Sequence, residues 1–188
     1  MMPVDARVLR LPGMRRVRQF VRAVTEHVTA ADRRHVKAVL PEKAWPLFAA
    51  MHPADQCHVL HVERTAEEMA DEASLTREER ALLARCALLH DVGRVKGDLN
   101  VVGKVFAVLM MHGLPSWGKR MACAEAHHLW QRPGHALYVY CHHPAIGAAR
   151  LRGIGMEEEA SIIEQHHEPP GLLDTPVLRI LKAADEQN

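Results

Sequence analysis

The chain has 188 residues, enough for one domain with a sizeable core, and its 48% hydrophobic and 25% charged content is ordinary for a soluble globular protein. A formal net charge of +1 produces no overall electrostatic attraction to nucleic acid, so no nucleic-acid partner is expected. Four scattered cysteines without a Cys-x-x-Cys pair argue against a zinc ribbon and a disulfide framework, which favours a reduced, cytoplasmic setting. Fourteen histidines are the compositional anomaly.

Short helices are expected in the first part of the chain. A stripe of apolar residues predicts a helix over 14–28, and a capping-box pattern at Thr29 predicts a second helix over 30–40. Pro41 suits the first turn of a third helix, which ends near residue 51. These segments carry no evident chemistry, so residues 1–52 are interpreted as an N-terminal helical extension.

Two longer helices and an apolar segment follow. Pro53 suits the start of a helix that continues through residue 70 or beyond, and a cap signal at Thr76 predicts a helix over 77–89. Residues 101–111 predict an apolar helix, which could pack in the core, form a homodimer contact or face a membrane. The apolar run is too short to cross a bilayer, so no transmembrane segment is expected.

Proline and glycine divide the remaining chain into short helices. Pro133-Gly134 predicts a break, Pro144 predicts the start of a new helix, and Pro169-Pro170-Gly171 predicts a stop. Few alternating β-branched runs appear, so the predicted fold class is all-α. The expected helices cover residues 117–130, 135–142, 144–153, 156–168 and 176–185.

An adjacent His-Asp pair stands at the end of the apolar helix 77–89. Packed residues up to Leu89 would fix the backbone, so His90 and Asp91 would lie at a rigid helix end. A neutral imidazole and a carboxylate can both coordinate a transition metal, and the carboxylate could bridge a second one. Gly93 would allow a sharp turn directly afterwards. The dipeptide alone is weak evidence, because such pairs occur by chance.

Further candidate ligands lie on separate predicted helices, often near their ends. Imidazoles and carboxylates without thiolates suit Fe, Mn, Co, Ni or Zn better than Mg or Ca. Their number exceeds one tetrahedral site, which predicts two divalent transition metals about 3.5–4 Å apart. The candidates are His58, His90, Asp91, His143, Asp185 and one or both of His166 and His167.

The ordered set resembles the HD-domain superfamily of metal-dependent phosphohydrolases, which combines an early His, an adjacent His-Asp, further histidines and a late Asp. The similarity covers about residues 53–188 and implies a helical bundle around one or two metals. The segments that carry the resemblance are His58-Val59-Leu60-His61-Val62, Leu88-Leu89-His90-Asp91-Val92-Gly93-Arg94, His143-Pro144-Ala145-Ile146-Gly147-Ala148, Ile163-Glu164-Gln165-His166-His167-Glu168 and Leu181-Lys182-Ala183-Ala184-Asp185.

The resemblance implies two metal positions and a hydrolytic reaction. The first position would use His58, His90, Asp91 and Asp185. Asp91 would bridge to a second metal held by His143 and by His166, His167 or both. A metal-bound hydroxide would then attack phosphorus in a small phosphorylated substrate, expected to be a nucleotide or a similar phosphoester.

Other polar residues near these motifs are candidates for contacts with the substrate. Arg94 stands where many relatives have Lys and could bind phosphate through two parallel hydrogen bonds. Lys96 and Lys104 could also contact phosphate, although a solvated surface charge is the favoured explanation of both. His61 could bind phosphate or act as a general acid.

The spacing of Pro, Gly and the double His is similar to that of the HDIG-type cyclic-di-GMP phosphodiesterase branch. Pro169-Pro170-Gly171 replaces the branch's Asp-Gly-x-Gly-Tyr-Pro signature, and Ala54 stands where that branch has Glu, which argues against this substrate. Two alternative functions stay open: a non-catalytic module that binds a nucleotide and signals to a partner, and a mixed-valent di-iron oxygenase of the same superfamily.

Overall fold

The computed structural model describes residues 27–95, 110, 113–124 and 132–188. Within these ranges the regular structure is helical and contains no strand, which confirms the all-α prediction. None of the helices found there is both long and apolar enough to cross a membrane. The elements are α2 (Ala30–Val39), the 3-10 helix η2 (Glu42–Ala44), α3 (Trp45–Ala50), α4 (Pro53–Glu72), α5 (Arg77–Leu89), α7 (Pro115–Met121), α8 (Arg132–Gly153), α9 (Glu157–Glu164) and α10 (Pro176–Gln187).

Side-chain caps fix the start of several helices. At α5, the Thr76 hydroxyl accepts from the Glu79 amide at 3.2 Å, and the Glu79 carboxylate accepts from the Thr76 amide at 2.9 Å. The same reciprocal pair forms between Thr29 and Asp32 at α2. These caps satisfy amides that have no partner inside the helix. Both predicted capping boxes are confirmed, and α5 has the predicted bounds.

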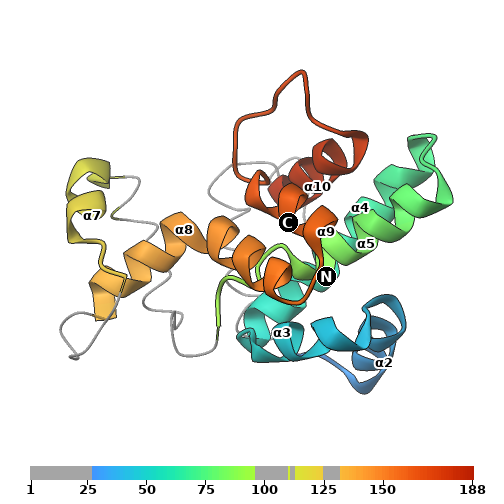
Figure 1. Cartoon of the computed structure of the whole chain (residues 1–188), viewed down its shortest axis with the longest axis horizontal. Helices are drawn as coiled ribbons and strands as arrows, with labels where there is room; N and C mark the ends of the chain where they lie inside the picture. Colours follow the sequence, from blue (N-terminus) through green and yellow to red (C-terminus); the bar gives the residue numbers. More distant parts are fainter. Residues whose placement is uncertain (1–26, 96–109, 111–112, 125–131) are drawn as a thin grey trace, which may run out of the picture.

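Two helix pairs make up most of the molecule. The antiparallel helices α4 and α5 pack on each other, and α10 packs against both (Figure 1). Helices α8 and α9 form the second pair across a tight turn, in which Gly155 has a φ of +67°. A side chain would be strained there, so glycine suits the turn. Helix α7 lies at the far end of α8, and α2 and α3 lie on the side opposite α10 (Figure 1).

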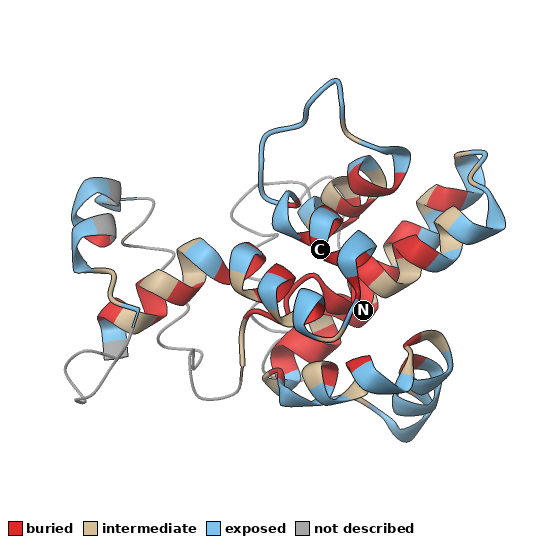
Figure 2. Cartoon of the chain, viewed as in Figure 1, coloured by how far each residue is buried: buried red, intermediate tan, exposed pale blue. Residues whose placement is uncertain are grey.

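The hydrophobic core has two main parts. One joins α2, η2 and α3 to α4, α5, α8 and α9 through residues such as Phe48, Leu89 and Ile163. The other joins α4 and α5 to α10. Figure 2 shows the buried residues gathered where these helices meet. Residues 27–52 therefore share a core with the rest of the chain, and the predicted domain boundary at residue 52 stays a prediction.

The predicted breaks around α8 are wrong. Pro133 and Gly134 lie in the first turn of α8, where proline lacks only an amide that would have no helical partner. Pro144 does not start a new helix, because α8 continues through it to Gly153. A proline inside a helix removes one hydrogen bond, the one to the carbonyl four residues earlier. In α8 that carbonyl belongs to Tyr140, and it has another use in the site.

Other boundaries also differ from the prediction. Helix α9 ends at Glu164 rather than at residue 168, so the double His lies in a turn after the helix. Pro169 disfavours helical geometry at the residue before it, which is consistent with this early end. Helix α7 covers Pro115–Met121, so the predicted helix 117–130 is wrong over 122–124, and its part 125–130 lies outside the described residues. Most of the predicted helices 14–28 and 101–111, with the homodimer or membrane contact suggested for 101–111, also lies outside the described residues. Residues 27 and 28 are described and are not helical.

Gly93 is required by a close approach rather than by an unusual backbone angle. Among the described residues only Gly155 has a positive φ. A Cβ atom on Gly93 would collide with the backbone carbonyl of His143 in α8. A Cβ atom on Gly147, one turn further along α8, would lie 3.2 Å from the Gly93 nitrogen. The turn after α5 thus rests directly on the backbone of α8.

Replacing Gly93 with alanine should therefore push this turn away from α8. We expect Gly93→Ala to lower the free energy of unfolding by about 3 kcal/mol. The new Cβ atom would meet backbone atoms of His143, which cannot rotate away as a side chain could. Chemical denaturation followed by circular dichroism measures the change. Gly153→Ala is the control, since a Cβ there meets no described atom within 4 Å. Equal stability of the two variants would contradict the close approach.

Candidate metal centre

Five separate elements bring the predicted ligands together. His58 comes from α4, His143 from α8 and Asp185 from α10. The His-Asp pair directly follows α5, and the double His follows α9. Three groups form, and within each group the ligand atoms lie within 4.8 Å of one another. The groups are His58, His90 and Asp185; His90, Asp91 and His166; and His143, His166 and His167.

The first group centres on the carboxylate of Asp185. His58 Nε2 donates a hydrogen bond to Asp185 Oδ1 at 3.0 Å. His90 Nε2 lies 3.6 Å from the same oxygen and 3.9 Å from Asp91 Oδ2. Two imidazole nitrogens and carboxylate oxygens thus face one point, as the ligands of a transition metal do.

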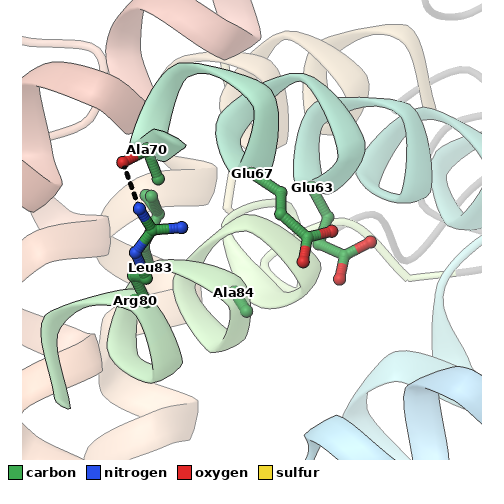
Figure 3. A pocket seen from close by; sticks show the side chains of 6 residues that line it. All are labelled: Glu63, Glu67, Ala70, Arg80, Leu83 and Ala84. Atoms are coloured by element: carbon green, nitrogen blue, oxygen red, sulfur yellow. Dashed lines mark hydrogen bonds between the residues drawn. The ribbon is translucent and has the colours of Figure 1, made fainter. Parts of the chain in front are cut away.

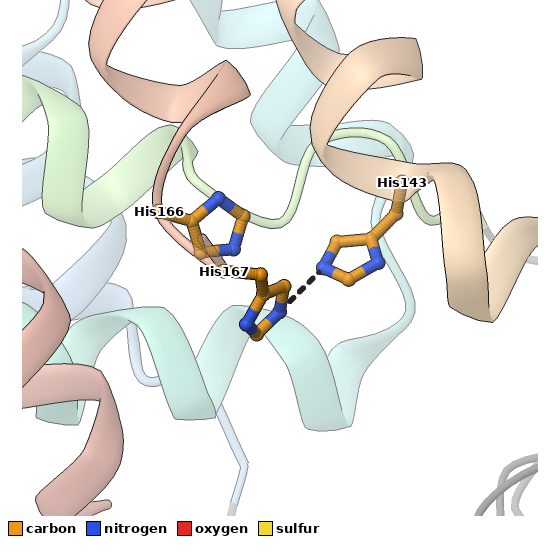
Figure 4. A group of neighbouring side chains, drawn as sticks. All are labelled: His143, His166 and His167. Carbon is orange, nitrogen blue, oxygen red and sulfur yellow. Dashed lines mark hydrogen bonds between the residues drawn. The ribbon is translucent and has the colours of Figure 1, made fainter. Parts of the chain in front are cut away.

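The third group, which consists of His143, His166 and His167, contains only imidazoles. His143 Nε2 lies 3.0 Å from His167 Nε2, while His166 stands beside both rings (Figure 4). Asp91 Oδ1 lies 3.4 Å from His143 Nε2. Asp91 therefore stands between the two groups, which fits the bridging role that the sequence resemblance implies.

Backbone carbonyls orient three of the rings in the same way. Each Nδ1–H donates to the carbonyl three residues earlier: His90 to Ala87 at 2.9 Å, His143 to Tyr140 at 3.0 Å, and His166 to Ile163 at 2.6 Å. A proton on Nδ1 leaves the Nε2 lone pair of a neutral ring directed into the site. Metal-binding histidines are commonly fixed by such a partner.

Local helix geometry supplies these carbonyls. Ala87 and Ile163 lie in the last turns of α5 and α9, where a carbonyl lacks the usual bond from the amide four residues later. The Ile163 carbonyl also accepts from the His166 amide at 3.3 Å. Tyr140 lies inside α8, but Pro144 has no amide to donate to it. Pro144 therefore leaves an acceptor for His143 in the middle of a continuous helix.

Several ligand atoms are buried without a hydrogen-bond partner. His90, Asp91, His143 and His166 are each no more than 3% exposed. Among the described residues, His90 Nε2, Asp91 Oδ1 and His166 Nε2 have no hydrogen-bond partner. Buried polar atoms are normally paired, since an unpaired one costs about 1–3 kcal/mol. These atoms are the donors that a transition metal binds, so the residues fit a metal ion.

Burial and charge set the protonation of the metal-free site. Burial alone lowers the pKa of His90, but the carboxylates of Asp91 and Asp185 outweigh it and raise this pKa to about 9. Burial lowers the pKa of His166 to about 3, with help from nearby imidazoles. Burial and the Arg94 charge hold the pKa of His143 well below its usual value. His90 thus carries a proton at neutral pH, while His143 and His166 are neutral.

The acidic ligands stay ionised despite their burial. Desolvation would raise the pKa of Asp91, but the charges of Arg94 and the surrounding histidines lower it well below its usual value. Desolvation is likewise outweighed at Asp185, where His90 and His58 lower the pKa. The site therefore presents two carboxylates to a cation.

Arg94 belongs to the same network. Its Nη1 donates to Asp91 Oδ2 at 2.6 Å, and its Nη2 donates to His143 Nε2 at 2.9 Å. Burial alone would lower the pKa of Arg94, but Asp91, Asp55 and Asp185 raise it. Asp55 was missed by sequence reasoning. It is 2% exposed, in the first turn of α4, where an acidic residue is expected for the helix dipole alone.

The remaining predicted site residues are not placed among the ligands. His61 is partly exposed on α4, three residues after His58, and belongs to none of the three ligand groups found among the described residues. Its role as phosphate ligand or general acid stays a prediction. Lys96 and Lys104 lie outside the described residues.

A small pocket between α4 and α5 offers no alternative site. It has a volume of about 60 Å³. Figure 3 shows the side chains that line it. Arg80 lines it and donates to the Ala70 carbonyl at 2.7 Å. Pockets that enclose a drug-sized ligand have volumes of about 300–1,000 Å³, so this one is too small for a substrate of nucleotide size. The lining residues are Glu63, Glu67, Ala70, Arg80, Leu83 and Ala84.

Comparison with known proteins gives one match. The family model described as HD domain matches residues 56–186, which include every predicted metal ligand. This confirms the superfamily named by the sequence resemblance, while the HDIG-type subdivision stays a prediction. No curated protein and no solved structure matches the chain.

The protonation pattern predicts how metal binding depends on pH. A metal needs the Nε2 lone pair of His90, so binding at about pH 7.5 should release about one proton, because the pKa of His90 is about 9. The affinity should rise about tenfold per pH unit from pH ~7 to ~9 and then level off. Calorimetric titration with Mn²⁺ in buffers of different ionisation enthalpy measures the release.

The same titration at about pH 10 is the control, since His90 is then neutral and no proton should leave it. Proton release that is the same at both pH values would contradict a protonated His90.

Proposed function

The chain belongs to the HD-domain family, which suggests a metal-dependent hydrolase, and on this premise we propose that it is a phosphohydrolase acting on a nucleotide or another small phosphoester. One observation carries the proposal: His90 Nε2, Asp91 Oδ1 and His166 Nε2 are buried together, and none has a hydrogen-bond partner among the described residues. Ligand atoms left in this state favour a bound metal over a purely structural polar cluster.

Two ligand sets are available to divalent metals. His58, His90, Asp91 and Asp185 would hold the first metal. His143, His166 and His167, with Asp91 between the sets, offer ligands for a second, and occupancy by two metals stays a prediction. A divalent metal bound there supplies the electrophile, because it acidifies water and neutralises charge that develops on a phosphoryl group. The absence of cysteine from all three groups favours Fe, Mn, Co, Ni or Zn.

The protein's own residues would position the phosphate. The Arg94 guanidinium is fixed by Asp91 and is only 17% exposed, so its position is defined before any substrate arrives. A guanidinium has five N–H donors, and two of those on Arg94 bond to Asp91 and His143. The other donors can bind phosphoryl oxygens. His61, partly exposed on α4, is proposed as the general acid for the leaving group.

Replacing Asp91 with alanine tests the proposal. Asp91→Ala removes a carboxylate that contributes to both ligand sets, so it should lose at least one metal per chain and reduce hydrolysis by at least about a thousandfold. The measurements are elemental analysis of untagged protein and a screen of nucleotides and other phosphoesters. Asp71→Ala is the matched control, because the Asp71 side chain is 72% exposed and pairs with Arg80. It should keep both metal and activity.

Three results would contradict the proposal in different ways. Metal content unchanged in Asp91→Ala would overturn the ligand assignment. Metal-dependent oxygen consumption with an organic substrate, in place of phosphate release, would favour the di-iron oxygenase. Tight nucleotide binding without turnover under every metal would favour a non-catalytic signalling module.

A further inference from the structure

The two ligand sets differ in whether an arginine side chain bonds to a ligand nitrogen. In the first set, His90 Nε2 has no hydrogen-bond donor among the described residues. In the second set, the guanidinium of Arg94 bonds both to His143 Nε2 at 2.9 Å and to Asp91 Oδ2 at 2.6 Å. A planar cation thus joins the carboxylate between the sets to an imidazole of the second set.

The contact with His143 excludes a metal at the same nitrogen. The Nδ1–H of His143 donates to the Tyr140 carbonyl, so the lone pair of its neutral ring lies on Nε2. An imidazole nitrogen has one lone pair in the plane of the ring. Arg94 Nη2 donates to this lone pair at 2.9 Å, and His167 Nε2 lies 3.0 Å from the same nitrogen. A metal ion would need the same lone pair. His143 can therefore bind Arg94 or a metal, but not both.

The surroundings hold the guanidinium in place. Arg94 is 17% exposed, and the carboxylates of Asp91, Asp55 and Asp185 all act on its charge. Asp55 is 2% exposed and belongs to neither ligand set. A second dication next to this fixed charge would also be repelled, since two charges about 4 Å apart interact strongly even in a partly screened site.

We propose that Arg94 takes the place of a second metal ion: its guanidinium occupies the lone pair of His143 and one oxygen of Asp91, so the chain binds one metal rather than two. The inference rests on the proposed function, because it assumes that the first ligand set holds a metal. The site would then combine one metal with one fixed guanidinium, which can neutralise phosphate charge and donate hydrogen bonds but cannot acidify water.

Counting bound Mn²⁺ in the full chain tests this. Equilibrium dialysis with elemental analysis should give one equivalent for the natural protein and two for Arg94→Ala, with a second-site affinity at least about a hundredfold higher than in the natural protein. Arg94→Met should also bind two, which guards against a folding defect in one variant. Adding His143→Ala to Arg94→Ala should return the count to one.

The matched control is Arg152→Ala, which removes an arginine that pairs with Glu164 on the surface and should leave the count at one. Two equivalents in the natural protein would overturn the inference but leave the proposed function standing. One equivalent in both Arg94 variants would also overturn it. No bound Mn²⁺ in the natural protein would overturn the proposed function itself, and the inference with it.

Discussion

The contact between the backbone of Gly93 and the carbonyl of His143 is the constraint on which the candidate site depends. It lets the turn after α5 lie directly on α8, without a side chain between them. The His-Asp pair just before this turn is thereby brought against His143. Leu88 and Leu89 are fully buried at the end of α5, and their packing fixes the backbone that carries His90 and Asp91. A shift at this contact would move Asp91 relative to His143.

Backbone carbonyls near helix ends then orient the histidine rings of the candidate site. A histidine near the end of a helix can donate Nδ1–H to a carbonyl that the helix leaves available, and this turns Nε2 away from the helix. His90 and His166 use the ends of α5 and α9. His143 lies in the middle of α8, where Pro144 creates the equivalent of a helix end without stopping the helix. One local rule thus explains three ligands from three different helices.

The sequence predicted which residues converge better than it predicted the helices that carry them. Periodicity and caps are local, so α5 was found with its bounds, and the order of the motifs indicated which residues would converge. Pro144 was misinterpreted because a proline inside a helix is tolerated only when surrounding packing compensates, and packing is not visible in one sequence. Asp55 and the pairing of Arg94 with His143 were missed for the same reason, since both depend on contacts between distant segments.

The number of metals that such a site holds depends on lone pairs more than on the number of ligand residues. Seven candidate ligands would suffice for two metals if every lone pair were available. Each of these buried atoms is more stable with a hydrogen-bond donor, an acceptor or a metal beside it, because an unsatisfied buried polar group destabilises the fold. Where the chain provides an internal cation, as at His143, the partner is already present. Where it does not, as at His90 Nε2, folding and metal binding would stabilise each other, since a bound metal would satisfy an atom that has no hydrogen-bond partner among the described residues.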